Sequence, residues 1–559
     1  MRTSILALIV ISFARLFGQP LQTFTRADTL RGTLSPLRTC YDVLFYHLDV
    51  KIDTAKGPIV GSNSMIIRVV SDFDQMQIDL FENMNVDSIV LDGITRVQFS
   101  REFNAVFVRL PQTLAKGSVH MLRVFYSGTP QEALNPPWQG GFTWTRDKQG
   151  NPWIVVSCQS LGASVWWPNK DHQSDEPDSM LISITVPTNL DEVSNGRLRA
   201  KTNLGNGWTR YDWFVSYPIN NYNVTFAIGR YVHFHDVYRN PDGDTLSLDY
   251  FVMPYNLDKA RKQFEQVKPM MQCYEKLFGK YPFLRDGYKL IETPHLGMEH
   301  QSAVAYGNAY IQGYRGTASS SVGVKFDFII IHESAHEWWG NAVTSNDLAD
   351  MWIHESFGAY AEAVYVECQY GYDEAMKYVN GKKTAILNDR PIIGPRGVNK
   401  SGSGDMYNKG QLVLNTLRHA IGNDRLWWDI LKSIQEEFRY KSIDAEDIFK
   451  LVNRKTGKDW TPFFDQYLKK TSLPKLDVNI LKKADSVTVR YRWRTEVKGF
   501  NMPVKITDER GKWITVEPDE NWKTLKMIYL EPDQFRVAED QFYIETRISR
   551  IYVDPQRLN

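Results

Sequence analysis

The spacing of apolar side chains changes near Asn256, and this change constrains the fold more than any other feature of the chain. From about Tyr41 to Ser247, apolar and polar residues mostly alternate with period two, in short runs broken by Gly, Pro, Asn and Asp. Successive side chains of a strand point to opposite faces, so this period is typical of β-sheet. The runs are also rich in β-branched and aromatic residues, which favour strands. We therefore expect an N-terminal antiparallel β domain over residues 37–247.

The chain after Asn256 has helical spacing instead. Apolar residues recur three or four positions apart up to Leu277, and Gly279 follows them as a stop signal. The same spacing predicts helices at about residues 326–340, 350–370, 405–420, 424–439 and 445–455. Alternation returns from about Pro474. The predicted fold is thus α+β and multidomain, with a helix-rich domain over residues 248–472 and a small C-terminal β-sandwich over residues 473–559.

Composition narrows the classes of function. The 559 residues are too many for a single core, and a hydrophobic content of 43% is enough to bury several. Lys and Arg number 66 against 65 Asp and Glu, a formal net charge of +1 that argues against a nucleic-acid partner. The cysteines stand alone at Cys40, Cys158, Cys273 and Cys368, so they form no disulfide scaffold or Cys-rich zinc module, and their spacing demands no disulfide. A large globular enzyme is the first expectation.

The first residues have the pattern of a secretory signal peptide. Arg2 precedes about nine apolar residues over positions 5–13. A membrane helix needs roughly 20 apolar residues, so this run is too short to span comfortably. We expect residues 1–18 to be removed after Gly18, with Ala14 as a second choice, and the protein to be exported to the periplasm or the outside without a stable membrane anchor. The alternative is a buried N-terminal strand or helix.

A cluster of histidine and glutamate in the helix-rich region has the spacing of a metal site. His332 and His336 are one helical turn apart, so both imidazoles can reach one ion. Glu333 lies beside them, placed to accept a proton from a water that the metal activates. Glu355 follows His336 after eighteen residues, which leaves room for the next helix to return a third ligand. Two His and one Glu with an open fourth position are typical of catalytic zinc, and we predict one Zn²⁺ per chain. The alternative is a pair of hydrogen-bonded core histidines.

Four short segments match the motifs of one known family in the same order along the chain. Residues 296–300 read L-G-M-E-H against G-x-M-E-N, and residues 336–341 read H-E-W-W-G-N against H-x-W-F/W-G-N. Residues 350–357 read D-M-W-I-H-E-S-F against D-x-W-L-N-E-G-F, and residues 406–410 read M-Y-N-K-G against Y-x-K-G. Over roughly residues 40 to 555, the chain resembles the gluzincin aminopeptidases, the family of aminopeptidase N and the leukotriene-hydrolase enzymes. The resemblance implies a thermolysin-like catalytic domain, in a short form without the large helical C-terminal domain of longer relatives.

The resemblance also implies a role for each matched residue. Glu299 binds the free α-ammonium of a peptide substrate with the amide of Gln159 beside it, and Tyr407 donates a hydrogen bond to the developing oxyanion. The implied set is Glu333 and Tyr407 in catalysis, Gln159, Gly297, Met298 and Glu299 in substrate binding, and His332, His336 and Glu355 as zinc ligands.

Three positions depart from the family pattern. Leu296 stands where Gly is common, and His300 and His354 each stand where Asn is usual. Leu296 and His300 flank the site expected for the first residue of the substrate, so they bear on the amine-binding geometry.

The metal motif predicts a zinc-dependent hydrolase, and the resemblance implies an aminopeptidase that removes N-terminal residues from peptides and serves in peptide breakdown. Three alternatives stay open: a zinc endopeptidase with the same metal centre, a hydrolase of a non-peptide substrate such as an epoxide, and a non-catalytic peptide-binding protein. The oligomeric state and the preferred N-terminal side chain cannot be derived from the sequence.

Overall fold

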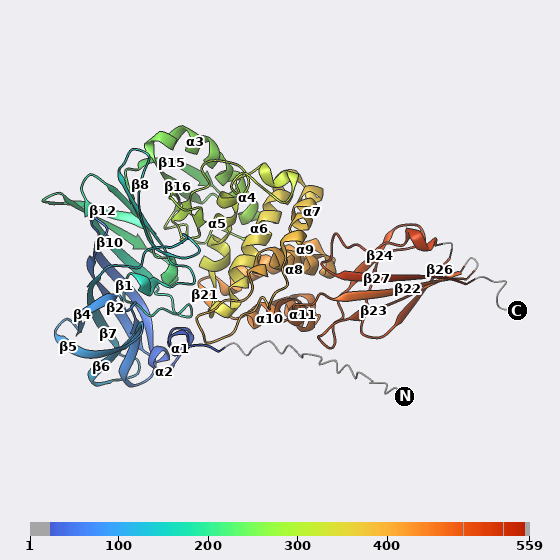
Figure 1. Ribbon diagram of the computed structural model, residues 1–559, viewed down its shortest axis with the longest axis horizontal. Helices are drawn as coiled ribbons and strands as arrows, with labels where there is room; N and C mark the ends of the chain where they lie inside the picture. Colours follow the sequence, from blue (N-terminus) through green and yellow to red (C-terminus); the bar gives the residue numbers. More distant parts are fainter. Residues whose placement is uncertain (1–22, 484–485, 529, 554–559) are drawn as a thin grey trace, which may run out of the picture.

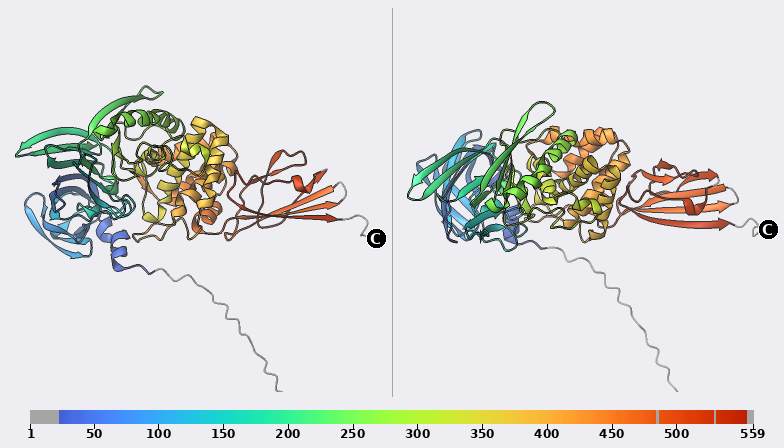
Figure 2. Two further views of the ribbon diagram at one scale, coloured as in Figure 1. Left: turned by 45° about the horizontal axis from the view of Figure 1, so that its top comes forward. Right: turned by 90° about the horizontal axis from the view of Figure 1, so that it is seen from above.

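The computed structural model describes residues 23–483, 486–528 and 530–553, and it divides into three regions arranged in a row (Figure 1). A β-rich region and a helical region pack side by side, and a narrow β region projects from the far end of the helices (Figure 2). This is the predicted α+β multidomain fold. The expected signal peptide, residues 1–18, lies outside the described residues. Within the described ranges, no helix combines the length and apolarity needed to cross a membrane.

The N-terminal region is built on a ten-stranded sheet and a second, four-stranded sheet. The helices α1 (Arg26–Gly32) and α2 (Pro36–Thr39) precede them. The large sheet has the order β12-β13-β10-β1-β2-β7-β4-β5-β6-β3, and its pairs are antiparallel except β1 with β10. Its strands are β1 (Tyr41–Lys51), β2 (Ile59–Val69), β3 (Phe73–Asp79), β4 (Met84–Leu91), β5 (Thr95–Glu102), β6 (Ala105–Leu114), β7 (Val119–Gly128), β10 (Ser179–Pro187), β12 (Arg197–Gly205) and β13 (Trp208–Val215). The small sheet has the order β11-β14-β9-β8, with β8 (Gly141–Arg146), β9 (Pro152–Ser157), β11 (Asp191–Ser194) and β14 (Phe226–Gly229).

The strands of this region follow the alternation of the sequence. In β13, Tyr211, Trp213 and Val215 are buried, whereas Arg210 and Asp212, at the alternate positions, are half-buried and form an ion pair of 2.7 Å. One face of the strand therefore joins the core and the other meets solvent.

A five-stranded sheet of order β15-β16-β17-β19-β18 begins the central region. Its strands are β15 (Val232–Arg239), β16 (Thr245–Val252), β17 (Tyr288–Glu292), β18 (Gly297–Met298) and β19 (Val304–Tyr306). The domain boundary expected at residues 247/248 falls inside β16. Because β16 pairs with β15 on one side and with β17 on the other, the whole β15–β16 hairpin joins the central sheet.

Helices form the rest of the central region, and they lie where the helical spacing predicted them, with α7 and α11 in addition. They are α3 (Leu257–Gln263), α4 (Val267–Phe278), α5 (Phe328–Ala335), α6 (Trp352–Tyr370), α7 (Tyr372–Gly381), α8 (Asn408–Ile421), α9 (Asp424–Phe438), α10 (Ala445–Thr456) and α11 (Thr461–Lys469). The short strands β20 (Val343–Ser345) and β21 (Lys441–Ile443) pair in parallel beside them.

Helix α5 is shorter than its apolar pattern predicts. The Asp327 carboxylate caps its start by accepting from the Ile329 N–H, and the helix ends at Ala335 in place of residue 340. A wide turn over Glu337–Asn341 follows, in which Trp339 and Gly340 leave helical geometry. This turn matters for the site, because it redirects the Trp339 carbonyl.

A disulfide joins α4 to α6. Cys273 and Cys368 are bonded across a sequence separation of 95 residues, with their Cα atoms 6.1 Å apart. No local pattern indicates this pair, because only the packing of α4 against α6 brings the two thiols together. Cys40 and Cys158 are free and buried.

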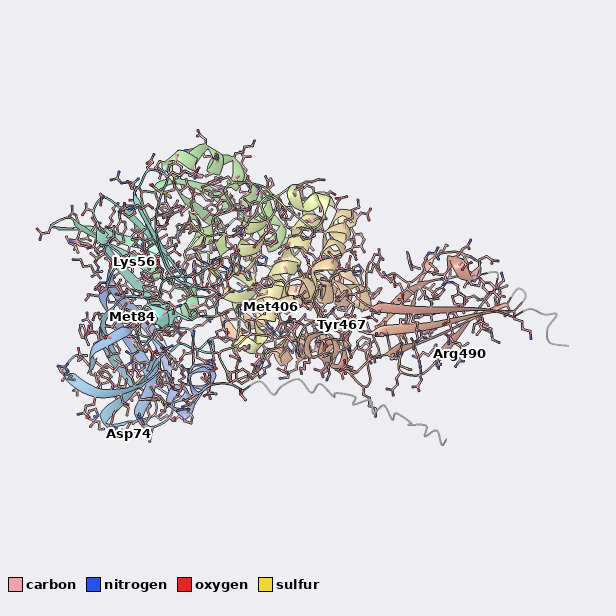
Figure 3. All side chains as sticks on the ribbon, in the orientation of Figure 1. Lys56, Asp74, Met84, Met406, Tyr467 and Arg490 are labelled. Carbon is pink, nitrogen blue, oxygen red and sulfur yellow. A yellow bond between two sulfur atoms is a disulfide. The ribbon has the colours of Figure 1, made fainter. Side chains whose placement is uncertain are left out.

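The C-terminal region is the expected small β module. A four-stranded sheet of order β26-β23-β22-β27 faces a two-stranded sheet of β24 and β25. The strands are β22 (Lys475–Lys483), β23 (Ser486–Arg494), β24 (Val504–Thr507), β25 (Trp513–Val516), β26 (Lys523–Ile528) and β27 (Glu545–Val553). Tyr467 of α11 lies at the junction with this module, where its hydroxyl donates to the Tyr543 carbonyl at 2.8 Å, whereas Arg490 is an exposed residue of β23, away from the junction (Figure 3).

Candidate active site

A cavity of about 510 Å³ contains every site residue that the sequence predicts. The N-terminal region contributes Pro137, Trp138 and Gln159 to its wall, and the central region contributes the rest. The predicted residues that line it are Gln159, Gly297, Met298, Glu299, His332, Glu333, His336, Glu355 and Tyr407. Residues more than 200 positions apart in sequence therefore line the same cavity.

Three buried side chains in this cavity place their potential ligand atoms in a triangle. His332 Nε2 and His336 Nε2 are 3.3 Å apart, and Glu355 Oε2 lies 3.7 Å from the first and 3.5 Å from the second. Tetrahedral zinc with ligands at about 2.0–2.1 Å requires ligand atoms roughly 3.3 Å apart. Glu355 Oε2 is buried and has no hydrogen-bond partner among the described residues, as a metal ligand would be in the absence of its ion. The donor set therefore fits Zn²⁺.

A hydrogen bond at Nδ1 orients the ring of each histidine. His332 Nδ1 lies 2.7 Å from Glu362 Oε1, and His336 Nδ1 lies 2.8 Å from the Trp339 carbonyl that the wide turn supplies. These acceptors fix the proton on Nδ1, which leaves each Nε2 as the ligand atom. Glu362 is not among the residues predicted from the sequence, although it follows Glu355 by two helical turns on α6 and so shares its face.

Glu333 lies beside the ligand triangle without joining it. Burial raises the pKa of this carboxyl to about 7, near the value that suits a general base at neutral pH. The chain passes very close to it at Gly297, because a Cβ atom there would lie 2.6 Å from Glu333 Oε1. A side chain at residue 297 would therefore displace the Glu333 carboxylate, which gives a reason for the glycine of the predicted motif.

Glu299 is held at one oxygen and free at the other. Oε1 accepts from Gln159 Nε2 at 2.5 Å and from the Tyr222 hydroxyl at 3.1 Å, and Asn341 Nδ2 donates to the backbone carbonyl of Glu299 at 2.8 Å. No described residue donates to Oε2. Burial and the carboxylate of Glu355 raise the pKa of Glu299, which favours its neutral form. A cation beside Oε2 would lower this pKa and favour the ionised form.

Tyr407 follows the turn Gly404–Met406, which lies near the middle of the molecule, and it precedes α8 (Figure 3). Its side chain is 37% exposed, and its ring centroid lies 6.0 Å from that of His332. Desolvation in the cavity and the carboxylates of Glu355 and Glu299 raise the pKa of the phenol well above its ordinary value near 10. The hydroxyl therefore stays protonated and can donate a hydrogen bond.

The departures from the family motifs fall in different places. Leu296 lines the cavity, but His300 does not. His300 is buried, and its Nε2 has no partner among the described residues. Of these two departures, the one at residue 296 therefore changes the cavity wall, and the one at residue 300 does not.

Comparison with known proteins identifies the central region. Residues 262–467 match the peptidase family M1 domain. The chain carries an M1 peptidase domain. Human endoplasmic reticulum aminopeptidase 1 (Homo sapiens) is 22% identical over 355 residues, which cover 61% of this chain and 37% of that protein. Aminopeptidase B of Mus musculus is 25% identical over 361 residues, covering 58% of this chain and 50% of that protein. The chain thus spans half or less of the length of these curated relatives.

The arrangement around the M1 domain is also known from solved structures. A zinc metallopeptidase of family M1 from Deinococcus radiodurans, determined as a mutant bound to a Tyr-Ser-Ala substrate, superposes with a TM-score of 0.65 at 20% identity. The match covers 78% of this chain and 96% of that one. The resemblance stated from the sequence is confirmed, and the fold is that of the M1 zinc metallopeptidases.

Proposed function

We propose that the protein is a zinc-dependent aminopeptidase that removes one residue at a time from the N-terminus of a peptide. One observation carries the proposal: Glu299 shares the cavity of the His332–His336–Glu355 triangle, and its Oε2 accepts no hydrogen bond from the residues that the structure describes. A carboxylate fixed beside a hydrolytic metal site is what a substrate α-ammonium requires. The M1 domain supports the hydrolytic part, and Glu299 supports the restriction to free N-termini.

Each side chain then has a defined task. His332, His336 and Glu355 would hold a zinc ion, which would supply Lewis acidity at the scissile carbonyl and lower the pKa of water. Glu333 accepts a proton from the attacking water and delivers it to the leaving amine. Tyr407 donates to the developing oxyanion, while Glu299 and Gln159 hold the α-ammonium so that the first peptide bond faces Glu333.

The test is chromophore release from a panel of aminoacyl amides, each with a free and an N-acetylated amine, with and without a chelator. We expect the free amines to be cleaved and the blocked ones to be spared, and the chelator to stop turnover. Equal cleavage of both forms would indicate an endopeptidase. Cleavage of an epoxide without any amide would indicate a non-peptide hydrolase, and binding without turnover would indicate a peptide-binding protein.

We also propose that the protein is exported through the signal peptide of residues 1–18. The Cys273–Cys368 disulfide supports export, because such bonds persist in oxidising compartments. Expression of the full chain followed by N-terminal mass spectrometry of the exported fraction tests this. We expect the mature chain to begin at Gln19. Protein that keeps Met1 and stays in the cytosol would contradict it.

A further inference from the structure

His354 lies outside the cavity but is connected to it by hydrogen bonds. The residue precedes Glu355 on α6, is fully buried, and is absent from the cavity wall. The backbone N–H of Ser345 donates to His354 Nε2 at 3.0 Å. A ring nitrogen that accepts a hydrogen bond carries no proton, so the ring is neutral and its proton sits on Nδ1.

That proton has one partner among the described residues. His354 Nδ1 lies 3.4 Å from the Tyr222 hydroxyl, and the two rings lie within 24° of parallel. Because Nδ1 donates, the Tyr222 oxygen accepts, and the single phenolic proton is left for Glu299 Oε1 at 3.1 Å. Every donor therefore points the same way, from Ser345 through His354 and Tyr222 to Glu299.

The backbone around His354 leaves room for its ring. Gly340 has a φ of +121°, and a Cβ atom at this position would lie 3.1 Å from His354 Cγ and Nδ1. The wide turn that brings the Trp339 carbonyl to His336 thus also makes space for the ring of His354. The imidazole is therefore enclosed on three sides, by Gly340, Ser345 and Tyr222.

We propose that His354 is a positioning residue for substrate recognition: through Tyr222 it holds Glu299 Oε1 so that Oε2 faces the substrate ammonium. The inference rests on the proposed aminopeptidase function and adds a residue to it. We call the hydrogen-bonded series from Ser345 through His354 and Tyr222 to Glu299 the relay. The relay requires a donor at the Nδ1 position of residue 354. An acceptor at the Nε2 position satisfies only the Ser345 N–H.

Two substitutions of similar size separate these roles. The amide of His354→Asn ends where Nδ1 lies and can donate to Tyr222, but it leaves the Ser345 N–H without a partner. The longer His354→Gln reaches the Nε2 position and can accept from Ser345, but it places no donor at Nδ1. A purely structural role for His354 would make the two variants equally harmful.

The kinetic test measures KM and kcat for a free-amine aminoacyl amide in His354→Asn, His354→Gln and Tyr222→Phe, each shown to hold one zinc. We expect KM to rise about tenfold in His354→Gln and in Tyr222→Phe, the size of one lost hydrogen bond to a charged group, with kcat little changed. His354→Asn should stay within about threefold of the parent in KM. The double variant Tyr222→Phe/His354→Gln should be no worse than either single one, because both break the same relay.

A second readout keeps this proposal separate from the proposed function. Long-range ¹H–¹⁵N spectra of histidine-labelled protein, with the His354 signal assigned by its loss in His354→Gln, should show the proton on Nδ1. A proton on Nε2 would overturn the relay whatever the enzyme cleaves. Equal KM values in His354→Asn and His354→Gln would also overturn it, provided that the parent prefers free amines. A parent without that preference would overturn the aminopeptidase function instead.

Discussion

Gln159 Nε2 donates to Glu299 Oε1 at 2.5 Å, so an amide of the N-terminal β region is bonded to the carboxylate that faces the cavity from the central region. The same amide lies 3.0 Å from Glu355 Oε1. One side chain therefore links the predicted amine anchor to a predicted metal ligand, across the boundary between two regions of the chain.

Replacing Gln159 with Met removes this link at nearly constant volume. We expect KM for free-amine substrates to rise about tenfold, since Glu299 loses a donor and can turn away from the ammonium. The kcat should fall less, because Glu333 and the three ligand side chains remain in place, although Glu355 Oε1 loses its bond from Gln159. Steady-state kinetics with zinc content measured in parallel checks this. Gln149→Met, in an exposed turn, is the matched control and should behave as the parent does.

Glu333→Gln tests the general base. The amide keeps the size of the side chain but cannot accept the proton, so we expect kcat to fall by about 10²–10⁴. Bound zinc should remain near one per chain, because Glu333 is not part of the ligand triangle. Metal analysis and turnover are measured on the same preparation, with the exposed Glu436→Gln of α9 as control. Full activity in Glu333→Gln would refute the assignment.

Glu362→Gln tests the residue behind His332. The carboxylate at 2.7 Å from His332 Nδ1 fixes the ring and raises the basicity of Nε2. A neutral amide does both less well, so we expect zinc affinity to fall about 10- to 100-fold. Titration in zinc buffers measures this affinity directly. Turnover at saturating zinc should recover most of its parent value, which distinguishes weakened metal binding from a damaged catalytic group.

Local spacing explains why part of this site was predictable from the sequence. His332 and His336 share a face because any helix places residues i and i+4 together. Glu355 required only that the following helix pack beside them. Gln159 was assigned by resemblance, but its bond to Glu299 depends on how the β region packs against the helices. The partnership of Tyr222 and His354 spans 132 residues, and no local pattern indicates it.

In the fold, too, local sequence patterns predict the individual elements, but they do not predict which elements pair with one another. The helices follow apolar periodicity, and their positions agree with the structure to within a few residues, except that α5 ends early at the turn around Gly340. The hairpin of β15 and β16 alternates like the strands before it, so alternation assigned most of it to the N-terminal domain. Only its pairing with β17 shows that it belongs to the central sheet.

Tyr407→Phe tests the oxyanion donor and its ionisation. Loss of one such donor costs about 10²–10³ in kcat, and KM should change little because the ground-state carbonyl is not yet charged. Desolvation and the nearby carboxylates raise the pKa of Tyr407, so the phenol keeps its proton and its donor role below pH 10. Any decline of parent activity between pH 8 and pH 10 should therefore persist, with the same midpoint, in Tyr407→Phe. A midpoint that disappears in the variant would show that Tyr407 itself titrates there.

Reduction of the Cys273–Cys368 bond should destabilise the catalytic region. The bond closes a loop of 95 residues between α4 and α6, and removing a cross-link of this length costs roughly 2–4 kcal/mol, chiefly through the greater freedom of the unfolded chain. Thermal unfolding followed by calorimetry, with and without reductant, measures the effect. The double variant Cys273→Ser/Cys368→Ser should unfold at the temperature of the reduced parent and should not respond to reductant, because Cys40 and Cys158 are free. A parent whose unfolding temperature is unchanged by full reduction would contradict a stabilising role for the bond.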